Sequence, residues 1–477
     1  MAETLRQLRP ELLTLGAALL VILVDLIQPR GQSRRWLGWF SGLLAAALLA
    51  VLVSDWRLVS PPQELWGGVM RVDHLGVIFK AIFLLGVGVC AIGSAEFAAT
   101  RFRNVGEYYA LLFFSALGMM LMASAGDLLT LYLGLEIATL SLYVLVAFAK
   151  DRPRSAEAGL KYVVLGATSS AVYIYGASLI YGSAGTTLFS GLMEAARGPA
   201  QAGLMVGAMM VLAALSFKVA AVPFHMWAPD VYQGAPSTVT AFLSTASKAA
   251  GFAALLRVFH GPIGRAAPEW LVVVAVLAAL SMIVGNLLAI PQRDIKRMLA
   301  YSGIAQAGYA LVGLASPTPL GTLATTFFLF QYLFTNLGAF LIVSLLGRGH
   351  EDEIVDYNGL SRRNPVLAFA LLLLLLSLGG IPPLSGFWGK LFVFWAAADS
   401  GQYGLVFIGV LASVVSLYYY LMVARAMYIE PVEDRPAVRV APAAALAVLI
   451  CVVIVIGLVY PAPLLKVAES AATVLFY

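Results

Sequence analysis

Long apolar runs separated by short polar loops constrain this chain of 477 residues more than any other feature of its sequence. A run of about 20 apolar residues is long enough to cross the hydrocarbon layer of a bilayer as a helix, and counting such runs predicts about fourteen spanning helices. With 61% hydrophobic and only 12% charged residues, the chain also lacks the polar surface that a soluble globule needs. The sequence therefore predicts an all-α polytopic membrane protein.

The distribution of basic residues predicts how the chain is oriented. A net charge of +5 would also fit a nucleic-acid-binding protein, but the Lys and Arg residues lie in short loops between apolar runs, so no nucleic acid is expected. They concentrate in alternate loops, as at Lys150, Arg152 and Arg154. The positive-inside rule places these loops in the cytoplasm and both termini on the outer face, in agreement with an even number of helices.

Charged side chains within the apolar runs are the main functional candidates. A charge at the bilayer centre costs about 2.5–3.5 kcal/mol, so it normally faces a partner or a water-filled cavity. The lysines inside predicted spans are Lys80, Lys161, Lys218, Lys248 and Lys390, and Glu136 is the carboxylate near the middle of a span. A desolvated lysine can lose its proton, whereas arginine stays charged. This selection indicates a path for protons.

The stretch from Leu204 to Arg257 contains two of these lysines and a predicted helix break. Pro223 frees backbone carbonyls just after Lys218, and His225 follows seven residues after that lysine. The functional interpretation is a protonatable lysine with a histidine relay beside it. The alternative is a lysine that reaches the interface and a histidine bonded to a loop carbonyl, which the depth of Lys218 disfavours.

The next span carries Lys248 at the end of a stripe of hydroxyl side chains. Ser237, Thr240 and Ser244 are spaced by three and four residues, which places them on one helix face leading to the lysine. Such a stripe can hold a file of water. It can also be ordinary small-residue packing between helices.

Glu136 and Lys390 complete the set of candidates near the middle of the membrane. Glu136 is either a structural counter-ion or a switch whose approach to Lys218 favours the charged lysine. Lys390 follows a second predicted break, at Gly379-Gly380-Ile381-Pro382-Pro383. Two broken helices, each with a lysine, suggest an internal repeat of the kind found in transporters built from inverted halves.

Two further lysines receive more ordinary interpretations. Lys161 lies near a basic loop, so it either assists the relay or extends to the interface. Lys80, close to Asp73, is interpreted as interfacial or locally paired. Cys90 and Cys451 both lie in apolar runs, where inert thiols are expected.

Four stretches carry a resemblance to a known family: DLLTLYLGLEIATLSLYVLVAF, SFKVAAVPFHMWAPDVYQGAPSTVTAFLSTASKAAG, QRDIKRMLAYSGIAQAGY and GGIPPLSGFWGKLFVF. They resemble the antiporter-like membrane subunits of respiratory complex I, the bacterial proton-pumping NADH:quinone oxidoreductase. The lysine in GFWGK makes the subunit N family, with its mitochondrial and plastid counterpart subunit 2, the nearest likeness. The resemblance covers nearly the whole chain.

The resemblance implies fourteen helices with two inverted five-helix repeats, each containing a broken helix. The implied divisions are a three-helix segment at 1–105, a proton-uptake repeat at 106–260, a proton-release repeat at 261–427, and a helix with an amphipathic tail at 428–477. It also implies a charged axis in the membrane plane, formed by Glu136, Lys218, Lys248 and Lys390, with Lys161 and His225 as adjuncts. Because the tenth and eleventh helices have no histidine, the two halves would be linked by water and by hydroxyl and amide side chains, namely Ser302, Gln306, Tyr309, Gln331, Thr335 and Asn336.

The function expected from these features is proton translocation in a bacterial cell membrane, driven by quinone reduction elsewhere in the assembly. We expect no cofactor in this chain; the flavin mononucleotide, iron–sulfur clusters and quinone would belong to partner subunits, which include a sister antiporter-like subunit. Alternatives are a subunit of a cation/proton antiporter or membrane-bound hydrogenase, a stand-alone antiporter, and a passive structural subunit.

Overall fold

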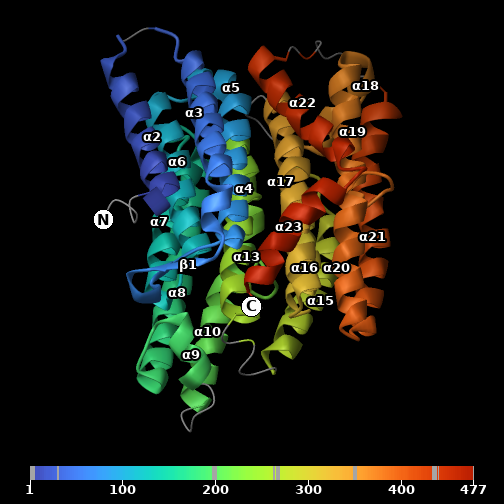
Figure 1. Ribbon diagram of the computed structural model, residues 1–477. Coiled ribbons are helices and arrows are strands. Elements are labelled where there is room, and N and C mark those ends of the chain that lie inside the picture. The colour runs from blue at the N-terminus through green and yellow to red at the C-terminus, as the bar shows by residue number, and fades with distance from the viewer. Residues whose placement is uncertain are drawn as a thin grey trace.

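Helices form nearly all of the regular structure in the computed structural model. It describes residues 6–29, 32–195, 201–261, 264, 269–347, 352–431, 438 and 440–475. The long helices run side by side as a bundle, with the connection between α2 and α3, the short helix α5 and the short helix α18 at one end and α9 at the other (Figure 1). We call the end that carries α5 and α18 the basic end, because Arg101, Arg362 and Arg363 lie there.

The N-terminal segment packs along one side of the bundle. Its elements are α2 (Arg9–Ile27), α3 (Arg35–Ser54), η1 (Trp56–Val59), β1 (Gln63–Leu65), η2 (Trp66–Gly68), β2 (Met70–Val72), α4 (His74–Gly93) and α5 (Ala95–Arg101). The two strands form a small antiparallel hairpin with Gln63 opposite Val72. Helix α4 is the most buried of these helices, because α3 covers one side of it and the central helices cover the other.

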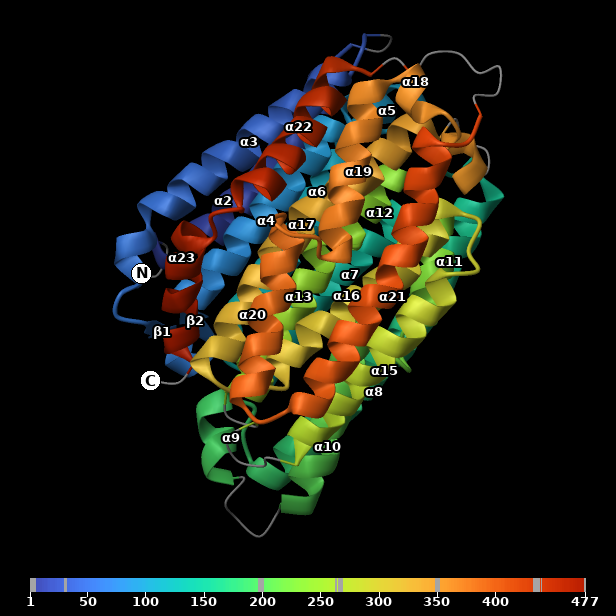
Figure 2. The same ribbon diagram turned by 90° about the vertical axis from the view of Figure 1, so that its right-hand side faces the viewer.

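The central and C-terminal helices follow in chain order. The first group is α6 (Val105–Ser124), α7 (Leu128–Val146), α8 (Pro153–Ala184), α9 (Phe189–Ala195), α10 (Gln201–Val219), α11 (Trp227–Gly234), α12 (Ser237–Leu243), α13 (Ala246–Leu255) and the π-helical turn η3 (Leu256–His260). The second is α15 (Trp270–Ala289), α16 (Ile295–Leu314), α17 (Pro319–Leu346), η4 (Ile354–Tyr357), α18 (Leu360–Arg363), α19 (Pro365–Gly379), α20 (Ser385–Asp399) and α21 (Tyr403–Tyr428). The last is α22 (Pro442–Gly457) and α23 (Ala462–Val474), which packs across α17 and α4 (Figure 2).

Local sequence explains where these helices begin. Asp127 accepts hydrogen bonds from two backbone N–H groups in the first turn of α7, and Asp294 accepts one from the first turn of α16. Such caps satisfy N–H groups that have no partner within the helix. Helices α8 and α17 begin with a proline, which needs no N–H partner at that position.

Small residues then bring the helices close together. A Cβ atom added to Gly118 of α6 would lie 2.3 Å from the backbone nitrogen of Ala138 in α7, and Gly285 of α15 meets α16 in the same way. Close backbone approach of this kind is how helices associate in a membrane, where burial of apolar surface does not drive them together.

The all-helical polytopic membrane fold is confirmed. In the described ranges, eleven helices are long and apolar enough to cross a membrane, or up to twelve if α22 and α23, bent by 91°, form one span. Fewer pass this test than the predicted fourteen, because α19 and α20 have only 15 residues each and α16 carries Lys296, Arg297 and Gln306. The count of fourteen and the inverted repeats therefore stay predictions.

The two predicted helix breaks are present, and a third was not predicted. Helix α10 ends at Val219 and α11 begins at Trp227, while α19 ends at Gly379 and α20 begins at Ser385. The apolar run at 236–259 forms one candidate span, Ser237–His260, which is interrupted at Thr245 between α12 and α13. No proline or glycine marks this interruption, so the sequence does not predict it.

Candidate functional site

Lys218 lies in the last turn of α10, directly before the break. Its side chain is 3% exposed, and its Nζ donates a hydrogen bond of 2.8 Å to the Thr139 hydroxyl of α7. The chain leaves the helix at Ala220, whose φ of +59° is unusual for a residue with a side chain. The lysine is therefore buried at the end of an interrupted helix, as the sequence predicts.

Glu136 lies one turn from Thr139 on the same helix α7. One of its carboxylate oxygens accepts a short hydrogen bond from Ser170 of α8. Its charge acts on Lys218, and the direct acceptor of the lysine is the neutral hydroxyl of Thr139. The spacing of three residues puts Glu136 and Thr139 on one face of α7, the face from which Thr139 accepts the hydrogen bond of Lys218.

Lys248 occupies the centre of the bundle. It is 2% exposed, its Nζ donates a hydrogen bond of 2.6 Å to the carbonyl oxygen of Gly303 in α16, and it lies 5.8 Å from the ring centre of Tyr232. Gly303 has no side chain at this contact, and an added Cβ would lie 3.0 Å from Nζ and 3.1 Å from the Tyr332 hydroxyl. The site thus places a lysine of the first half against the backbone of the second half.

Lys390 lies across the second break. It is 5% exposed, its Nζ donates a hydrogen bond of 3.0 Å to the carbonyl oxygen of Gly379 at the end of α19, and it lies 4.5 Å from the ring centre of Tyr309. Gly380, which follows Gly379 in the break, has a φ of +86°, a backbone conformation that favours glycine. Here the end of an interrupted helix supplies the acceptor for the buried lysine.

Polar side chains of α16 and α17 form hydrogen bonds near the segments that carry Lys248 and Lys390. The hydroxyls of Ser302 and Tyr420 are hydrogen-bonded at 2.5 Å, and Gln306 donates to the carbonyl oxygen of Leu378 at 3.0 Å. Asn336 of α17 donates to the Ser244 hydroxyl at 2.9 Å. These contacts join the segment of Lys248 to the helices that hold Lys390.

The two predicted adjuncts lie apart from this row of lysines. Lys161 is half-exposed, and its Nζ lies 2.8 Å from carboxylate oxygens of both Asp230 and Glu157. His225 lies in the break after Lys218, and its Nδ1 has no hydrogen-bond partner among the described residues. The structure brings neither side chain into a hydrogen bond with Lys218.

Sequence reasoning missed two buried ion pairs. Lys80 is buried and lies 2.6 Å from Glu11 of α2, so the expected local pairing was wrong; its carboxylate partner is 69 residues away in the sequence. The nearby Asp73 instead forms two hydrogen bonds of 2.7 Å with Arg257, and both side chains are 1% exposed. Charge counting along the chain indicated Lys80 and Asp73 but neither Glu11 nor Arg257, because pairing between distant helices has no local signal.

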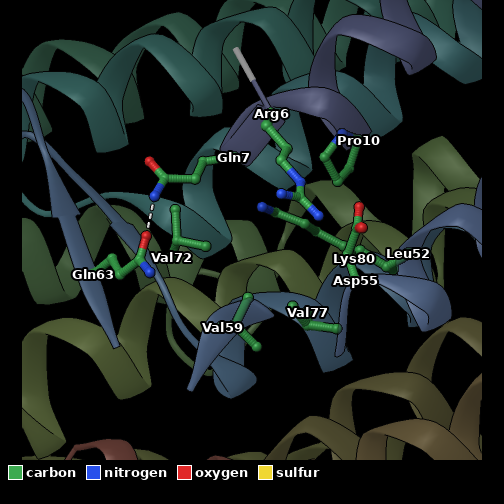
Figure 3. A pocket seen from close by; sticks show the side chains of 10 residues that line it. All are labelled: Arg6, Gln7, Pro10, Leu52, Asp55, Val59, Gln63, Val72, Val77 and Lys80. Carbon is green, nitrogen blue, oxygen red and sulfur yellow. Dashed lines mark hydrogen bonds between the residues drawn. The ribbon is translucent and has the colours of Figure 1, made fainter. Parts of the chain in front are cut away.

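A small pocket of about 100 Å³ lies at the Lys80 side of the N-terminal segment (Figure 3). Gln7 donates a hydrogen bond to Gln63 beside it, and Asp55 in its wall pairs with Arg9. The described residues include no group of three His, Cys, Asp or Glu side chains placed to hold a metal ion.

The fold and the site together define a class of membrane protein, a polytopic helical bundle in which buried lysines lie beside interrupted helices. Residues 125–416 match the family described as NADH:quinone oxidoreductase/Mrp antiporter, transmembrane. The chain belongs to this family.

Particular relatives agree with this membership. The chain is 46% identical over 468 residues to NADH-quinone oxidoreductase subunit N of Desulforamulus reducens, covering 97% of this chain and 96% of the relative. A chain of respiratory complex I from Thermus thermophilus, with bound aureothin, is 34% identical, covers 96% of this chain and 99% of its own, and has a TM-score of 0.82. A chain of the Mrp complex from Dietzia sp. DQ12-45-1b shares the fold, with 24% identity, 100% and 98% coverage and a TM-score of 0.87.

Proposed function

We propose that this chain is a proton-translocating membrane subunit of a bacterial NADH:quinone oxidoreductase. The 46% identity to a subunit N along nearly the whole chain supports this function. The observation that carries the mechanism is that Lys218, Lys248 and Lys390 are at most 5% exposed and hydrogen-bond to neutral oxygen atoms. A buried ammonium without a hydrogen-bonded carboxylate is only partly compensated, so a neighbouring charge can decide whether it keeps its proton.

The proposed path follows these three lysines. A proton from the cytoplasm passes through Lys218 and Lys248 and leaves on the outer side near Lys390. Quinone reduction in other subunits drives the transfer through electrostatic changes at Glu136, which acts on Lys218. A tenfold change in a protonation equilibrium needs only about 1.4 kcal/mol. Modest movement of a nearby charge is therefore sufficient.

Lys161 and His225 are assigned supporting roles in this path. Asp230, the carboxylate partner of Lys161, also pairs with Arg297 of α16, so this cluster joins the two halves near the basic end. His225 occupies the break after Lys218 with one ring nitrogen free of described partners. Both positions suit residues that pass protons toward the row without belonging to it.

The proposed architecture has fourteen spans. Two inverted five-helix repeats occupy 106–260 and 261–427, between a three-helix segment at 1–105 and a C-terminal helix and tail at 428–477. The breaks beside Lys218 and Lys390, one in each half, support this division. The basic end faces the cytoplasm, so both termini are on the outer face of the cell membrane.

Electron transfer belongs to other subunits in this proposal. Flavin mononucleotide, the iron–sulfur clusters and quinone are bound there, and a sister antiporter-like subunit lies beside this chain in the membrane. Large apolar side chains exposed along α7, among them Leu133 and Leu140, offer a surface for lipid or for such a neighbour.

A subunit of a cation/proton antiporter or of a membrane-bound hydrogenase is the alternative function. The likeness to the Mrp complex is at 24% identity and shows only the shared fold, so the higher identity to subunit N favours the oxidoreductase. Purification in mild detergent separates these functions: the proposal expects this chain to migrate with NADH-oxidising subunits. Migration without them would favour the antiporter.

Replacing Lys218 with Met tests the relay. We expect the assembled complex to lose proton pumping, measured as acidification of membrane vesicles, because the substituted side chain binds no proton. NADH oxidation by an artificial electron acceptor should remain and reports assembly. Lys466→Met, at an exposed position of α23, is the control and should pump normally. Normal pumping by Lys218→Met would favour a passive structural subunit.

A further inference from the structure

A hollow of about 460 Å³ opens at the basic end of the molecule, between loops that precede α8, α12 and α16 and the segment that follows α17. Charged side chains from three separate segments line it, and they are Asp151, Arg152, Arg154, Asp294, Lys296 and Asp352. Ser237, the first residue of α12, also lines it. A cavity of this size with a charged lining holds water, so aqueous solution reaches the start of α12.

Lys296 is the buried cation of this hollow. Lys296 is 4% exposed, although its position in the sequence, beside a basic loop, suggests a solvated charge. Its Nζ donates a hydrogen bond of 2.7 Å to the carbonyl oxygen of Ala235, and Asp352 is its ion-pair partner at 3.9 Å. The other charged groups that act on it are Asp294 and Arg152.

The carboxylate beside Lys296 is itself partly withdrawn from water. Burial raises the pKa of Asp352 above its ordinary value, which the charge of Lys296 opposes, and Asp294 and Asp356 add to the rise. The backbone holds Asp352 in place, because its carbonyl oxygen accepts a hydrogen bond of 2.8 Å from the N–H of Ile295. Lysine and carboxylate are thus fixed together at the edge of the hollow.

Helix α16 connects Lys296 to the row of buried lysines. Gly303, whose carbonyl oxygen accepts the hydrogen bond from Lys248, follows Lys296 by seven residues. Seven residues are about two turns, so both positions share one face of the helix and lie about 10 Å apart along its axis. Ser237 begins α12 at the hollow, and Ser244 at the other end of α12 accepts a hydrogen bond from Asn336 of α17.

We propose that Lys296, paired with Asp352, is the site that first binds each proton taken up from the aqueous phase, before the proton reaches the buried lysines Lys218 and Lys248. This assignment rests on the proposed proton-translocating function. The neutral Nζ takes a proton from water in the hollow, which forms an N–H bond and leaves the conjugate base in solution. That N–H bond then breaks toward water beside Ser237, and its electron pair stays on Nζ. No oxidant or reductant is needed.

A purely structural role for Lys296 makes a different prediction. If the lysine only stabilises the turn at Ala235 through its hydrogen bond, then any permanently charged donor of similar length should preserve proton pumping. Arginine keeps the positive charge and can donate to the same carbonyl, but it does not release its proton. Lys296→Arg therefore separates fastening of the turn from binding and release of a proton.

The test uses membranes that contain the assembled complex. Protons pumped per NADH oxidised are measured for Lys296→Arg, Lys248→Met and the control Lys150→Met, an exposed charge at the same end of the molecule. We expect Lys296→Arg to lose the same share of pumped protons as Lys248→Met, and Lys150→Met to match the unaltered complex. Normal pumping by Lys296→Arg together with loss in Lys248→Met overturns the inference alone. Normal pumping by Lys248→Met overturns the proposed function as well.

Asp352→Asn gives a second measurement that does not depend on how arginine fits. Without the carboxylate, the protonated form of Lys296 is less stabilised, so fewer sites are loaded as the pH rises. The pH at which pumping falls to half should therefore move to lower values, while electron transfer to an artificial acceptor keeps its profile. An unchanged pumping profile in Asp352→Asn overturns the proposed site.

Discussion

At the scale of single residues, the row of lysines depends on positions that carry no charge. Thr139, Gly303 and Gly379 provide the acceptors for the three buried ammonium groups, two of them through backbone carbonyls. A carbonyl or hydroxyl accepts from the protonated amine without the strong stabilisation that a carboxylate would give. With neutral acceptors, release of the proton therefore costs less free energy than it would with a carboxylate.

Gly303→Ala tests this arrangement without altering any charge. The new Cβ would lie 3.0 Å from the Nζ of Lys248 and 3.1 Å from the Tyr332 hydroxyl, so one of the two must move. We expect pumping to fall severalfold while the complex still assembles, measured as protons translocated per NADH. Gly182→Ala in α8, where an added Cβ meets nothing within 4 Å, is the matched control and should pump normally. Equal pumping by the two variants would show that the position of the Lys248 amine is not critical.

At the scale of elements, the sequence predicts helices better than it predicts their partners. Pro223 and the Gly-Gly-Ile-Pro-Pro stretch have local chemistry that interrupts a helix, so both breaks could be predicted. The interruption at Thr245 has no such residue. The sequence alone favours a solvated position for Lys296, because its charge ends the apolar run, whereas the turn at Ala235 and the segment at Asp352 that cover it are far away in the sequence. Burial of this kind comes from tertiary packing between distant segments.

The ion pair between Asp73 and Arg257 joins the N-terminal segment to the central helices. Burial alone would raise the pKa of the Asp73 carboxyl, but Arg257, with the hydrogen bond from the Gly76 N–H and the charge of Lys80, holds that pKa below its ordinary value. Because the folded-state pKa is depressed, the stabilisation is present above the unfolded-state pKa and is lost as the pH falls through the folded-state value. The pair therefore stabilises the docked segment at neutral pH.

Asp73→Asn tests this contribution. Asparagine caps a helix about as well as aspartate, so the start of α4 should survive, but Arg257 is left as a buried charge without its carboxylate. Breaking a buried ion pair costs about 3–5 kcal/mol, and we expect a clearly lower midpoint of thermal unfolding for the purified complex. Glu96→Gln, which breaks the exposed pair with Arg35, should change the midpoint little. An unchanged midpoint in Asp73→Asn would mean that the pair contributes no net stability.

At the scale of the whole molecule, the direction of proton movement depends on which end faces the cytoplasm. The hollow with Lys296 lies at the basic end, and α9 lies at the opposite end (Figure 1). The positive-inside rule assigns the basic end to the cytoplasm, which makes the hollow an uptake site. The opposite orientation would make the same hollow a release site.

Labelling of single cysteines in intact cells determines this orientation. Cys90 and Cys451 are both buried, so background labelling by a membrane-impermeant thiol reagent should be low. Lys150→Cys is exposed near the basic end, and Ser190→Cys is exposed on α9 at the other end. The reagent is added to cells whose cell wall or outer membrane is permeable but whose cell membrane is closed. We expect it to label Ser190→Cys under these conditions, and to label Lys150→Cys only after the cell membrane is opened. The reverse labelling pattern would mean that the basic end faces outward, and the assigned direction of proton movement, from Lys296 toward Lys390, would then be reversed.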